Sequence, residues 1–177
     1  MKALIFDTET SGLVENHTIK LEKQPEIIEF YGVIMDLETG EQFQELDLLI
    51  KPKFEISDEI TRITSITNAM LASALSFEKL HDLIAKLIEE APLVIAHNLS
   101  FDQEMIDLEF ERLDLVLEWP RPLCTVEATI HLKGFRLSLS ALHETLFGEP
   151  FAGAHRAKVD VQALARVCVE LFKRGEI

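Results

Sequence analysis

Two acidic residues near the start of the chain have the spacing of a metal-binding pair. Asp7 and Glu9 close the apolar run Ala3-Leu4-Ile5-Phe6, which predicts a buried strand that the turn signal Ser11-Gly12 ends. Because side chains alternate between the two faces of a strand, both carboxylates should point the same way. Such a pair at the edge of a core is unfavourable without a cation, and hard divalent ions prefer carboxylate oxygen. The pair therefore predicts a divalent-metal site, with a strand end that simply meets solvent as the alternative.

A third acid lies on a helix predicted over residues 157–174. Asp160 falls on the apolar stripe of this helix, in line with Val167 and Leu171. A carboxylate that faces a core is rare unless it is paired or binds a metal. A metal therefore explains Asp160, and a basic partner such as Lys158 is the alternative.

A histidine precedes this acid by five residues. Five helical residues turn through about 500°, so His155 and Asp160 converge only if the histidine lies in the loop before the helix, which Gly153 favours. A loop histidine beside a metal-bound carboxylate suits a general base, because its unperturbed pKa is about 6.5 and a loop can close over substrate. Alone, His155 would be an ordinary exposed histidine.

A second short apolar run, Leu93-Val94-Ile95-Ala96, leads into further candidates. Asn98, Phe101 and Asp102 follow it, and each has a structural alternative. Asn98 would turn or cap the chain, Phe101 would pack in the core, and Asp102 would sit in the first turn of a helix near the positive end of its dipole.

The order of the predicted elements indicates an α/β fold. A polar loop over residues 14–24, with His17 as an exposed histidine, precedes strands over 26–37 and 43–50, which form a hairpin around Glu38-Thr39-Gly40. Together with the first strand they predict an antiparallel meander. The later segments predict one short helix within residues 52–67, a helix from Ser76 to before Pro92, a helix with the stripe Ile106, Phe110, Leu113 and Leu117, a last short strand over 123–126, and helices over 138–147 and 157–174.

This order predicts a mixed central sheet with helices packed on it and the first strand at its centre. Sites in such sheets gather outside the carboxyl ends of the parallel strands. Asp7 and Glu9 follow one such strand, and Asn98 and Asp102 follow another. Four acids and one histidine from three separate segments are therefore expected around one edge of the sheet.

Length and composition fit one domain over residues 1–177. The net charge of −14 argues against a large non-specific nucleic-acid surface, although a short polyanion can still be held through metal ions. Any basic contribution must be local, and the candidates are Arg121, Lys133, Arg136, Arg156 and Lys158. The sequence has no bilayer-length apolar run and no secretory signal, and Cys124 and Cys168 lack metal-ligand spacing, so we expect a cytoplasmic protein with reduced cysteines and no membrane partner.

Three ordered motifs resemble those of the DEDDh (DnaQ-like) family of 3′→5′ exonucleases, within the ribonuclease H-like superfamily. They are Asp7-Thr8-Glu9-Thr10-Ser11-Gly12-Leu13, Ala96-His97-Asn98-Leu99-Ser100-Phe101-Asp102, and His155 with Asp160. The stretches 25–29 and 137–142 also resemble the start of the family's second strand and its penultimate helix. The resemblance spans essentially the whole chain.

The resemblance implies a ribonuclease H-like three-layer fold and release of nucleoside 5′-monophosphates from the 3′ end of nucleic acid, with two Mg²⁺ or Mn²⁺ ions. It implies Asp7, Glu9, Asp102 and Asp160 as metal ligands and His155 as the general base. The residues that it places along the 3′-terminal nucleotide are Thr8, Thr10, Leu13, Asn98 and Phe101. His97 is expected to support the strand–helix turn rather than bind metal.

Some residues depart from the family pattern. Thr64-Ser65-Ile66 stands where relatives often carry a His-Gly-Ile segment that contacts the terminal base, and Ser11 replaces the commoner threonine. A polymerase is a further candidate partner, but the sequence ends within a turn of its last predicted helix, without the tail that holds proofreading subunits on a polymerase. We therefore expect a DNA exonuclease without an implied proofreading role. The alternatives are an exoribonuclease and a non-catalytic nucleic-acid-binding module.

Overall fold

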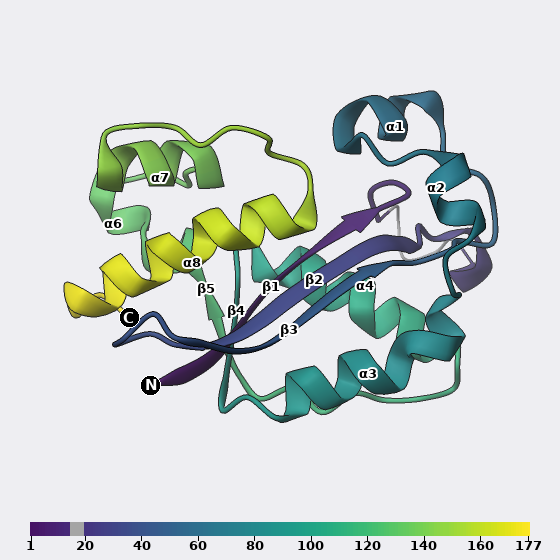
Figure 1. Cartoon of the computed structure of the whole chain (residues 1–177), viewed down its shortest axis with the longest axis horizontal. Helices are drawn as coiled ribbons and strands as arrows, with labels where there is room; N and C mark the ends of the chain where they lie inside the picture. Colours follow the sequence, from purple (N-terminus) through teal and green to yellow (C-terminus); the bar gives the residue numbers. More distant parts are fainter. Residues whose placement is uncertain (15–19) are drawn as a thin grey trace.

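The computed structural model of the chain describes residues 1–14 and 20–177. Residues 15–19 of the loop predicted over 14–24, His17 among them, lie outside the described residues. The five strands of the described sheet are ordered β3-β2-β1-β4-β5 (Figure 1). The first strand is therefore central, as predicted.

The sheet combines antiparallel and parallel pairs. β1 (Lys2–Thr10) is antiparallel to β2 (Ile27–Asp36), which is antiparallel to β3 (Gln42–Leu49). β1 is parallel to β4 (Leu93–Ala96), and β4 is parallel to β5 (Arg121–Cys124). The predicted meander and the parallel partner of the first strand are both confirmed. β1 continues through Asp7 and Glu9, because β2 pairs with it as far as Thr10.

Both faces of β1 are covered by helices, which gives three layers. Leu4 and Phe6 belong to a core shared with α3 (Phe77–Glu89) and α4 (Leu99–Glu111). Ala3 and Ile5 belong to a core on the opposite face, shared with α7 (Leu139–Phe147) and α8 (Ala157–Lys173). Figure 1 shows α7 and α8 on one side of the sheet and α3 on the other. This alternation confirms that the first strand tolerates no polar face along its apolar run.

The segments between the large elements form short helices. η1 (Leu21–Lys23) is a 3-10 helix before β2, and α1 (Asp58–Thr64) and α2 (Asn68–Ala72) stand where one short helix was predicted. α1 and α2 divide at Ser65, which has a left-handed backbone with φ of 62°, and each begins with a hydroxyl cap, from Ser57 and from Thr67. α5 (Thr125–Ala128) and α6 (Ile130–Lys133) follow β5 and were not predicted.

Two predicted element boundaries are wrong. The last strand was predicted over residues 123–126, but it covers Arg121–Cys124, and Thr125 begins α5. Pro122 fits inside this strand because β5 lies at the sheet edge, where a missing N–H is tolerated. α4 ends at Glu111, so Leu113 and Leu117 are not on its stripe, although Leu117 is buried in the same core.

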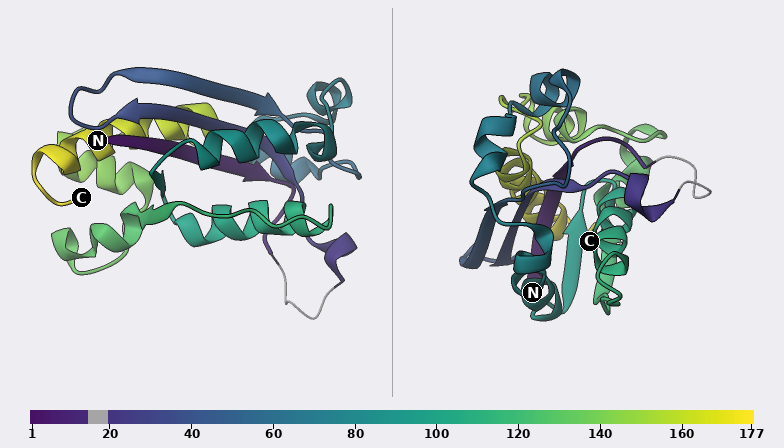
Figure 2. Two further views of the ribbon diagram at one scale, coloured as in Figure 1. Left: turned by 90° about the horizontal axis from the view of Figure 1, so that it is seen from below. Right: turned by 90° about the vertical axis from the view of Figure 1, so that its right-hand side faces the viewer.

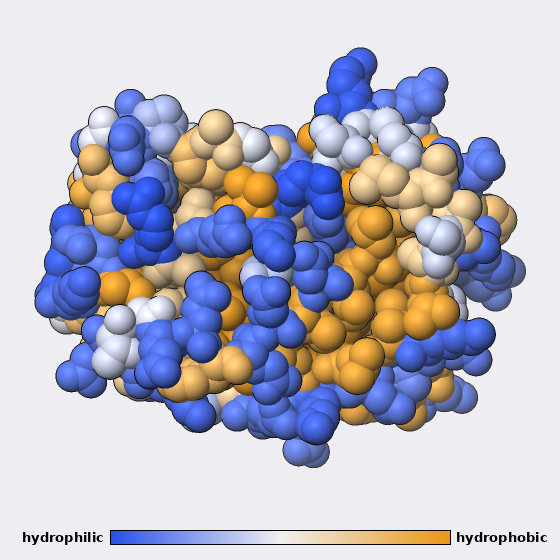
Figure 3. All heavy atoms as spheres, in the orientation of Figure 1, coloured by the Kyte–Doolittle hydropathy of each residue, from blue (hydrophilic) through white to orange (hydrophobic). Residues whose placement is uncertain are grey.

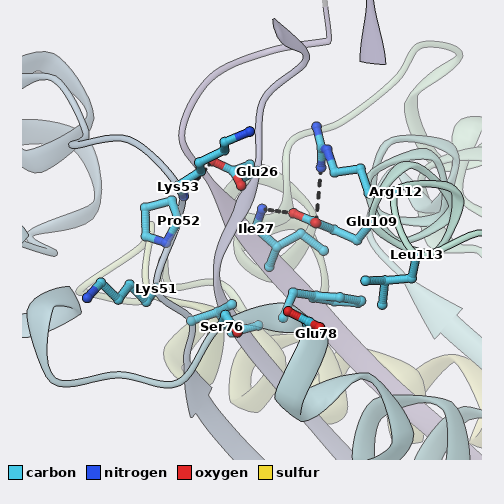
Figure 4. A pocket seen from close by; sticks show the side chains of 12 residues that line it. Glu26, Ile27, Lys51, Pro52, Lys53, Ser76, Glu78, Glu109, Arg112 and Leu113 are labelled. Carbon is cyan, nitrogen blue, oxygen red and sulfur yellow. Dashed lines mark hydrogen bonds and ion pairs between the residues drawn. The ribbon is translucent and has the colours of Figure 1, made fainter. Parts of the chain in front are cut away.

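One acidic side chain, Glu109, and one basic side chain, Arg112, fix the start of β2. Glu109 accepts a hydrogen bond from the Ile27 amide at 2.9 Å and pairs with Arg112 at 3.1 Å. Arg112 also donates to the carbonyl oxygens of Gln24 and Pro25, both at 2.9 Å. Ile27, Glu109 and Arg112 line a cavity of about 380 Å³ (Figure 4) whose lining includes none of the predicted site residues. We therefore assign Glu109 and Arg112 a structural role.

The surface is hydrophilic over most of the face in Figure 3, with an apolar area on the right that extends from below α2 across β3 toward α3. The two termini lie at the same end of the molecule, opposite α1 and α2 (Figures 1 and 2). Within the described part of the chain, no helix has the length and apolarity to cross a bilayer.

Candidate active site

Three of the predicted acids meet at the carboxyl end of β1. Oxygen atoms of Asp7, Glu9 and Asp160 all lie within 4.8 Å of one another. Asp7 and Glu9 are two residues apart on the strand and face α8, whose first turn carries Asp160. Lys158, the alternative partner of Asp160, instead pairs with Asp47 at 3.0 Å. The basic-partner explanation of Asp160 is therefore wrong.

A buried ion pair fixes the beginning of α8. Glu29 lies opposite Glu9 in the β1–β2 register, and its side chain is only 1% exposed. Its carboxylate accepts hydrogen bonds from the Arg156 guanidinium, the shortest at 2.6 Å, and from the Ala157 amide at 2.8 Å. Since Asp160 follows one turn later, this contact sets where its carboxylate lies.

His155 lies in the loop immediately before α8, the position that convergence with Asp160 requires. Its backbone has a positive φ of 70°, and its amide donates to Asp160 at 2.8 Å. His143 of α7 contacts the beginning of the same loop: it donates to the Glu149 carbonyl at 2.8 Å and packs against Phe151. His155 is thus exposed on a loop that is fixed at both ends.

A cavity of about 330 Å³ opens beside the acids. Its lining includes Asp7, Asp160 and His155, together with Ser138 and Leu139 from the start of α7. The predicted general base therefore lines the same cavity as two of the predicted metal ligands.

Asp102 is not among the three acids whose oxygens lie within 4.8 Å of one another. It is 2% exposed on α4, and one of its oxygens accepts hydrogen bonds from the Thr8 amide at 3.0 Å and the Thr8 hydroxyl at 2.7 Å. Thr8 points to the opposite face of β1 from Asp7 and Glu9. Asp102 therefore reaches the site from the α4 side, and among the neighbouring charges its own raises the pKa of Asp7 most.

The acids raise one another's pKa values. Burial, followed by the charges of Asp160 and Glu29, raises the pKa of Glu9 to about 8. Burial and the charges of neighbouring acids also raise the pKa of Asp7 well above its usual range. Burial raises the pKa of Asp102 to about 7 despite the hydrogen bonds from Thr8, and it raises that of Asp160. Such mutual repulsion is typical of carboxylates arranged around a cation.

The donor set fits divalent metal ions. Three carboxylates within 4.8 Å supply the oxygen ligands that Mg²⁺ and Mn²⁺ prefer. Arg156 lowers the pKa of Glu9, but its effect is smaller than the effects of burial and of the neighbouring acids. Arg156 is also itself bound to Glu29. Protein cations therefore compensate the three acids only in part.

His97 supports the turn after β4, as predicted. Its Nε2 donates to the Leu137 carbonyl at 3.1 Å, and its Nδ1 lies 2.9 Å from the Thr125 hydroxyl. Burial lowers the pKa of His97 to about 4, so the ring is neutral and its Nδ1 accepts from Thr125. Asn98 turns the chain with φ of 70°, and its side-chain oxygen accepts from Arg136 at 2.9 Å rather than capping α4.

The other predicted substrate residues differ in their accessibility. Leu13 is 77% exposed and Phe101 is partly exposed, so both can meet a ligand. Thr10 is buried and donates to the Gly12 carbonyl at 2.6 Å, and Thr8 is bound to Asp102. The structure therefore leaves Leu13 and Phe101 as the accessible members of this set and engages the two threonine hydroxyls internally.

Thr64 also points inward. Its hydroxyl donates to the Ile60 carbonyl at 2.9 Å and accepts from the Ile66 amide at 3.1 Å. In this chain the side chains of Thr64 and Ile66 serve the packing of α1.

Sequence reasoning missed the roles of Glu29 and Arg136. Glu29 was only part of a resembling stretch, although an acid inside the apolar strand Ile27–Asp36 signals a buried charge that needs a partner. Arg136 was counted among the local basic residues, and nothing in its spacing indicated its contact with Asn98.

Comparisons with known proteins place the chain in an exonuclease family. Residues 4–168 match the RNase_T family model, which is described as an exonuclease. The DNA polymerase III PolC-type of Thermotoga maritima is 31% identical over 178 residues, covering 97% of this chain and 12% of that protein. The corresponding protein of Pediococcus pentosaceus is 27% identical and is also covered over 12% of its length. The chain thus spans only a small part of these relatives.

Solved structures share the fold. One is exonuclease X in complex with 5′ overhanging duplex DNA, with a TM-score of 0.70 and 25% identity over 98% of this chain and 93% of that one. Another is a nuclease domain described as a DEDDh family member bound to rAMP, with a TM-score of 0.79 and 18% identity over 98% of this chain and 92% of that one. The predicted α/β fold with its mixed sheet is confirmed.

Proposed function

Because the chain belongs to the RNase_T exonuclease family, we propose that it is a metal-dependent 3′→5′ exonuclease that releases nucleoside 5′-monophosphates from DNA. The observation that carries the proposal is the meeting of Asp7, Glu9 and Asp160 within 4.8 Å of one another. His155 lines the same cavity as Asp7 and Asp160. These four side chains come from two distant segments, so their convergence is a property of the fold.

Each residue has a defined task in this proposal. Asp7, Glu9, Asp102 and Asp160 hold divalent ions, and Asp102 reaches them from the α4 side. The bound ions supply positive charge for the scissile phosphate and lower the pKa of the attacking water. His155 accepts the proton of that water as general base, and its exposed position on a fixed loop lets it approach the phosphate. Leu13 and Phe101 pack against the terminal base, a contact that tolerates any sequence.

DNA is the favoured substrate class. The relatives with the highest identities quoted above are DNA polymerases, and exonuclease X was solved with duplex DNA. RNA is the alternative, because the DEDDh nuclease domain of the same fold was solved with rAMP. A DNA polymerase is the corresponding candidate partner, since the matched region is part of one in the PolC-type proteins.

The test compares 5′-labelled single-stranded DNA and RNA of one sequence, with Mg²⁺, Mn²⁺ or EDTA. We expect a ladder that shortens from the 3′ end, mononucleotide products, faster cleavage of DNA, and no cleavage in EDTA. Faster cleavage of RNA would show that RNA, and not DNA, is the preferred substrate. Cleavage in EDTA would refute the metal dependence, and binding without cleavage would leave a non-catalytic module.

A further inference from the structure

Residues 128–143 are one of two long acid-free stretches of this acidic chain, the other being residues 60–77. The sequence has 31 aspartates and glutamates among 177 residues, yet residues 128–143 contain none. This stretch includes Lys133-Gly134-Phe135-Arg136, which we call the basic–aromatic loop. Phe135 is 61% exposed, and Lys133 and Arg136 beside it are also exposed. An exposed aromatic ring between two cations is typical of a surface that binds a nucleic-acid strand.

The backbone of the loop is fixed at both ends. Gly134 ends α6 with φ of 80°, and its amide donates to the Ile130 carbonyl at 2.7 Å. At the other end, the Leu137 carbonyl accepts from His97 at 3.1 Å. Phe135 is therefore exposed on an ordered turn, so binding a ligand would require little loss of backbone freedom.

The loop lies at the edge of the candidate active site. Arg136 donates to the Asn98 side chain at 2.9 Å, and Asn98 follows the carboxyl end of β4. Ser138 and Leu139, two and three residues after Arg136, line the cavity that also contains Asp7 and Asp160. A strand whose 3′ end occupies that cavity can therefore extend past the basic–aromatic loop.

The Arg136 guanidinium can still bind a phosphate in addition to its contacts within the protein. Its other contact is an ion pair with Glu127, in which the two side chains are 57% and 55% exposed. Such an exposed pair is weak, and a guanidinium has five N–H donors. A second exposed aromatic residue, Phe54, lies in a groove whose lining includes three acids, Glu22, Glu26 and Glu55, besides Lys23 and Lys53.

We propose that the basic–aromatic loop binds the nucleic-acid strand upstream of the scissile phosphate. Phe135 stacks on a base, and Arg136 and Lys133 contact backbone phosphates. The inference rests on the proposed function, because it requires a strand whose 3′ end lies in the cavity.

The test measures kcat and KM for Phe135→Ala and Arg136→Ala on single-stranded DNA of about 12 nucleotides. We expect KM to rise about 5-fold or more with kcat within about 2-fold, since stacking on an aromatic ring contributes substantially to strand binding. Arg136→Ala should also reduce the slope of log KM against log salt by about 0.7, as expected for one lost phosphate contact, whereas Phe135→Ala should not. On the p-nitrophenyl ester of thymidine 5′-monophosphate, which has no upstream nucleotide, both variants should lose much less activity.

Matched controls are Phe43→Ala, which removes an exposed ring on β3, and Arg174→Ala, which breaks an exposed pair with Glu170. Both should leave KM unchanged. Equal KM for all four variants and the wild type would overturn the role of the loop, and so would equal losses on strand and ester. Failure of the wild type to cleave either DNA or RNA would instead refute the proposed function.

Discussion

At the scale of single residues, the alternation of side chains along β1 explains why one acid stands apart. Asp7 and Glu9 face α8, so they meet Asp160, whereas Thr8 faces α4 and meets Asp102. The fourth acid therefore acts across the strand, through its charge and through Thr8. This arrangement separates the contribution of Asp102 to folding from its contribution to turnover.

Replacing Asp102 with asparagine should lower activity without lowering stability. An amide oxygen can accept both hydrogen bonds from Thr8, and the variant removes a buried charge whose pKa is raised to about 7. We expect kcat/KM to fall roughly 10-fold or more and the melting temperature at pH 8 to stay equal or rise. Kinetics and thermal unfolding measure the two effects.

The matched control for Asp102→Asn is Glu109→Gln, on the same helix. Glu109 is also buried, but its contacts with Arg112 and the Ile27 amide lie away from the candidate active site. The Glu109→Gln variant should lower the melting temperature and leave kcat/KM unchanged. If the Asp102→Asn variant kept full activity, Asp102 would have no role in turnover.

His155→Asn should abolish most turnover while the backbone of the loop is retained. Asparagine tolerates the positive φ of 70° at this position better than alanine does, and the amide that donates to Asp160 belongs to the backbone. We expect kcat to fall on the order of 100-fold or more, in both His155→Asn and His155→Ala. Mn²⁺ affinity, measured by titration calorimetry, should change little. Full activity in either variant would show that His155 is not the base.

At the scale of elements, the site depends on how β2 holds the start of α8. Glu29→Gln removes the charge that pairs with Arg156, although the amide can still accept from Ala157. Because a buried pair loses one partner, we expect a loss of about 2 kcal/mol or more in unfolding free energy, or roughly 4–8 °C in melting temperature. Turnover should fall as well, because Asp160 follows in the next turn.

Lys158→Ala is the control for Glu29→Gln. It breaks an exposed pair with Asp47 in the first turn of α8, two residues after Arg156, and should change the free energy of unfolding by less than about 0.5 kcal/mol. If both variants melt like the wild type, Glu29 does not anchor α8.

Local patterns were enough to predict most elements. Alternation and buried faces predicted the central strand and the helices α3, α7 and α8, because each of them pairs a strong apolar period with a clear start or stop. Where tertiary context decides, local patterns failed. The last strand was predicted to begin after Pro122, because the edge position that admits a proline in β5 is not visible in the sequence. The end of α4 at Glu111 was missed because apolar residues continue at the same spacing as far as Leu117.

The candidate site was predictable only in part, for a similar reason. Spacing within one segment placed Asp7 with Glu9 and placed His155 before its helix. Spacing cannot say on which face of β1 a distant helix packs, so it did not indicate that Asp102 reaches the site from the α4 side through Thr8. Contacts between segments, such as Glu29 with Arg156 and Arg136 with Asn98, depend on the assembled sheet.

At the scale of the whole molecule, the acidic site should make stability depend on pH and on metal. The unfolded chain releases the Glu9 proton near pH 4.5, and the folded chain releases it near pH 8. Between these values the folded state binds more protons, so the free energy of unfolding falls as pH rises. The pKa values of Asp7 and Asp160 are raised as well, which adds to the same trend.

In EDTA, the melting temperature should therefore be lower at pH 8 than at pH 5, by roughly 5–10 °C for a loss of about 2–3 kcal/mol. Mg²⁺ or Mn²⁺ at pH 8 should restore it, because an ion that binds only the folded state at about 100 times its Kd adds about 2.7 kcal/mol. Glu9→Gln should flatten the pH dependence and weaken the metal effect. Glu45→Gln, on exposed β3, should alter neither, because its amide oxygen can still accept the hydrogen bond from Tyr31. Because net charge alone would also favour acidic pH in a chain of −14, the decisive comparison is between these two variants, which change net charge equally. Identical pH profiles for Glu9→Gln and Glu45→Gln would mean that the repulsion lies elsewhere than in the three-acid group.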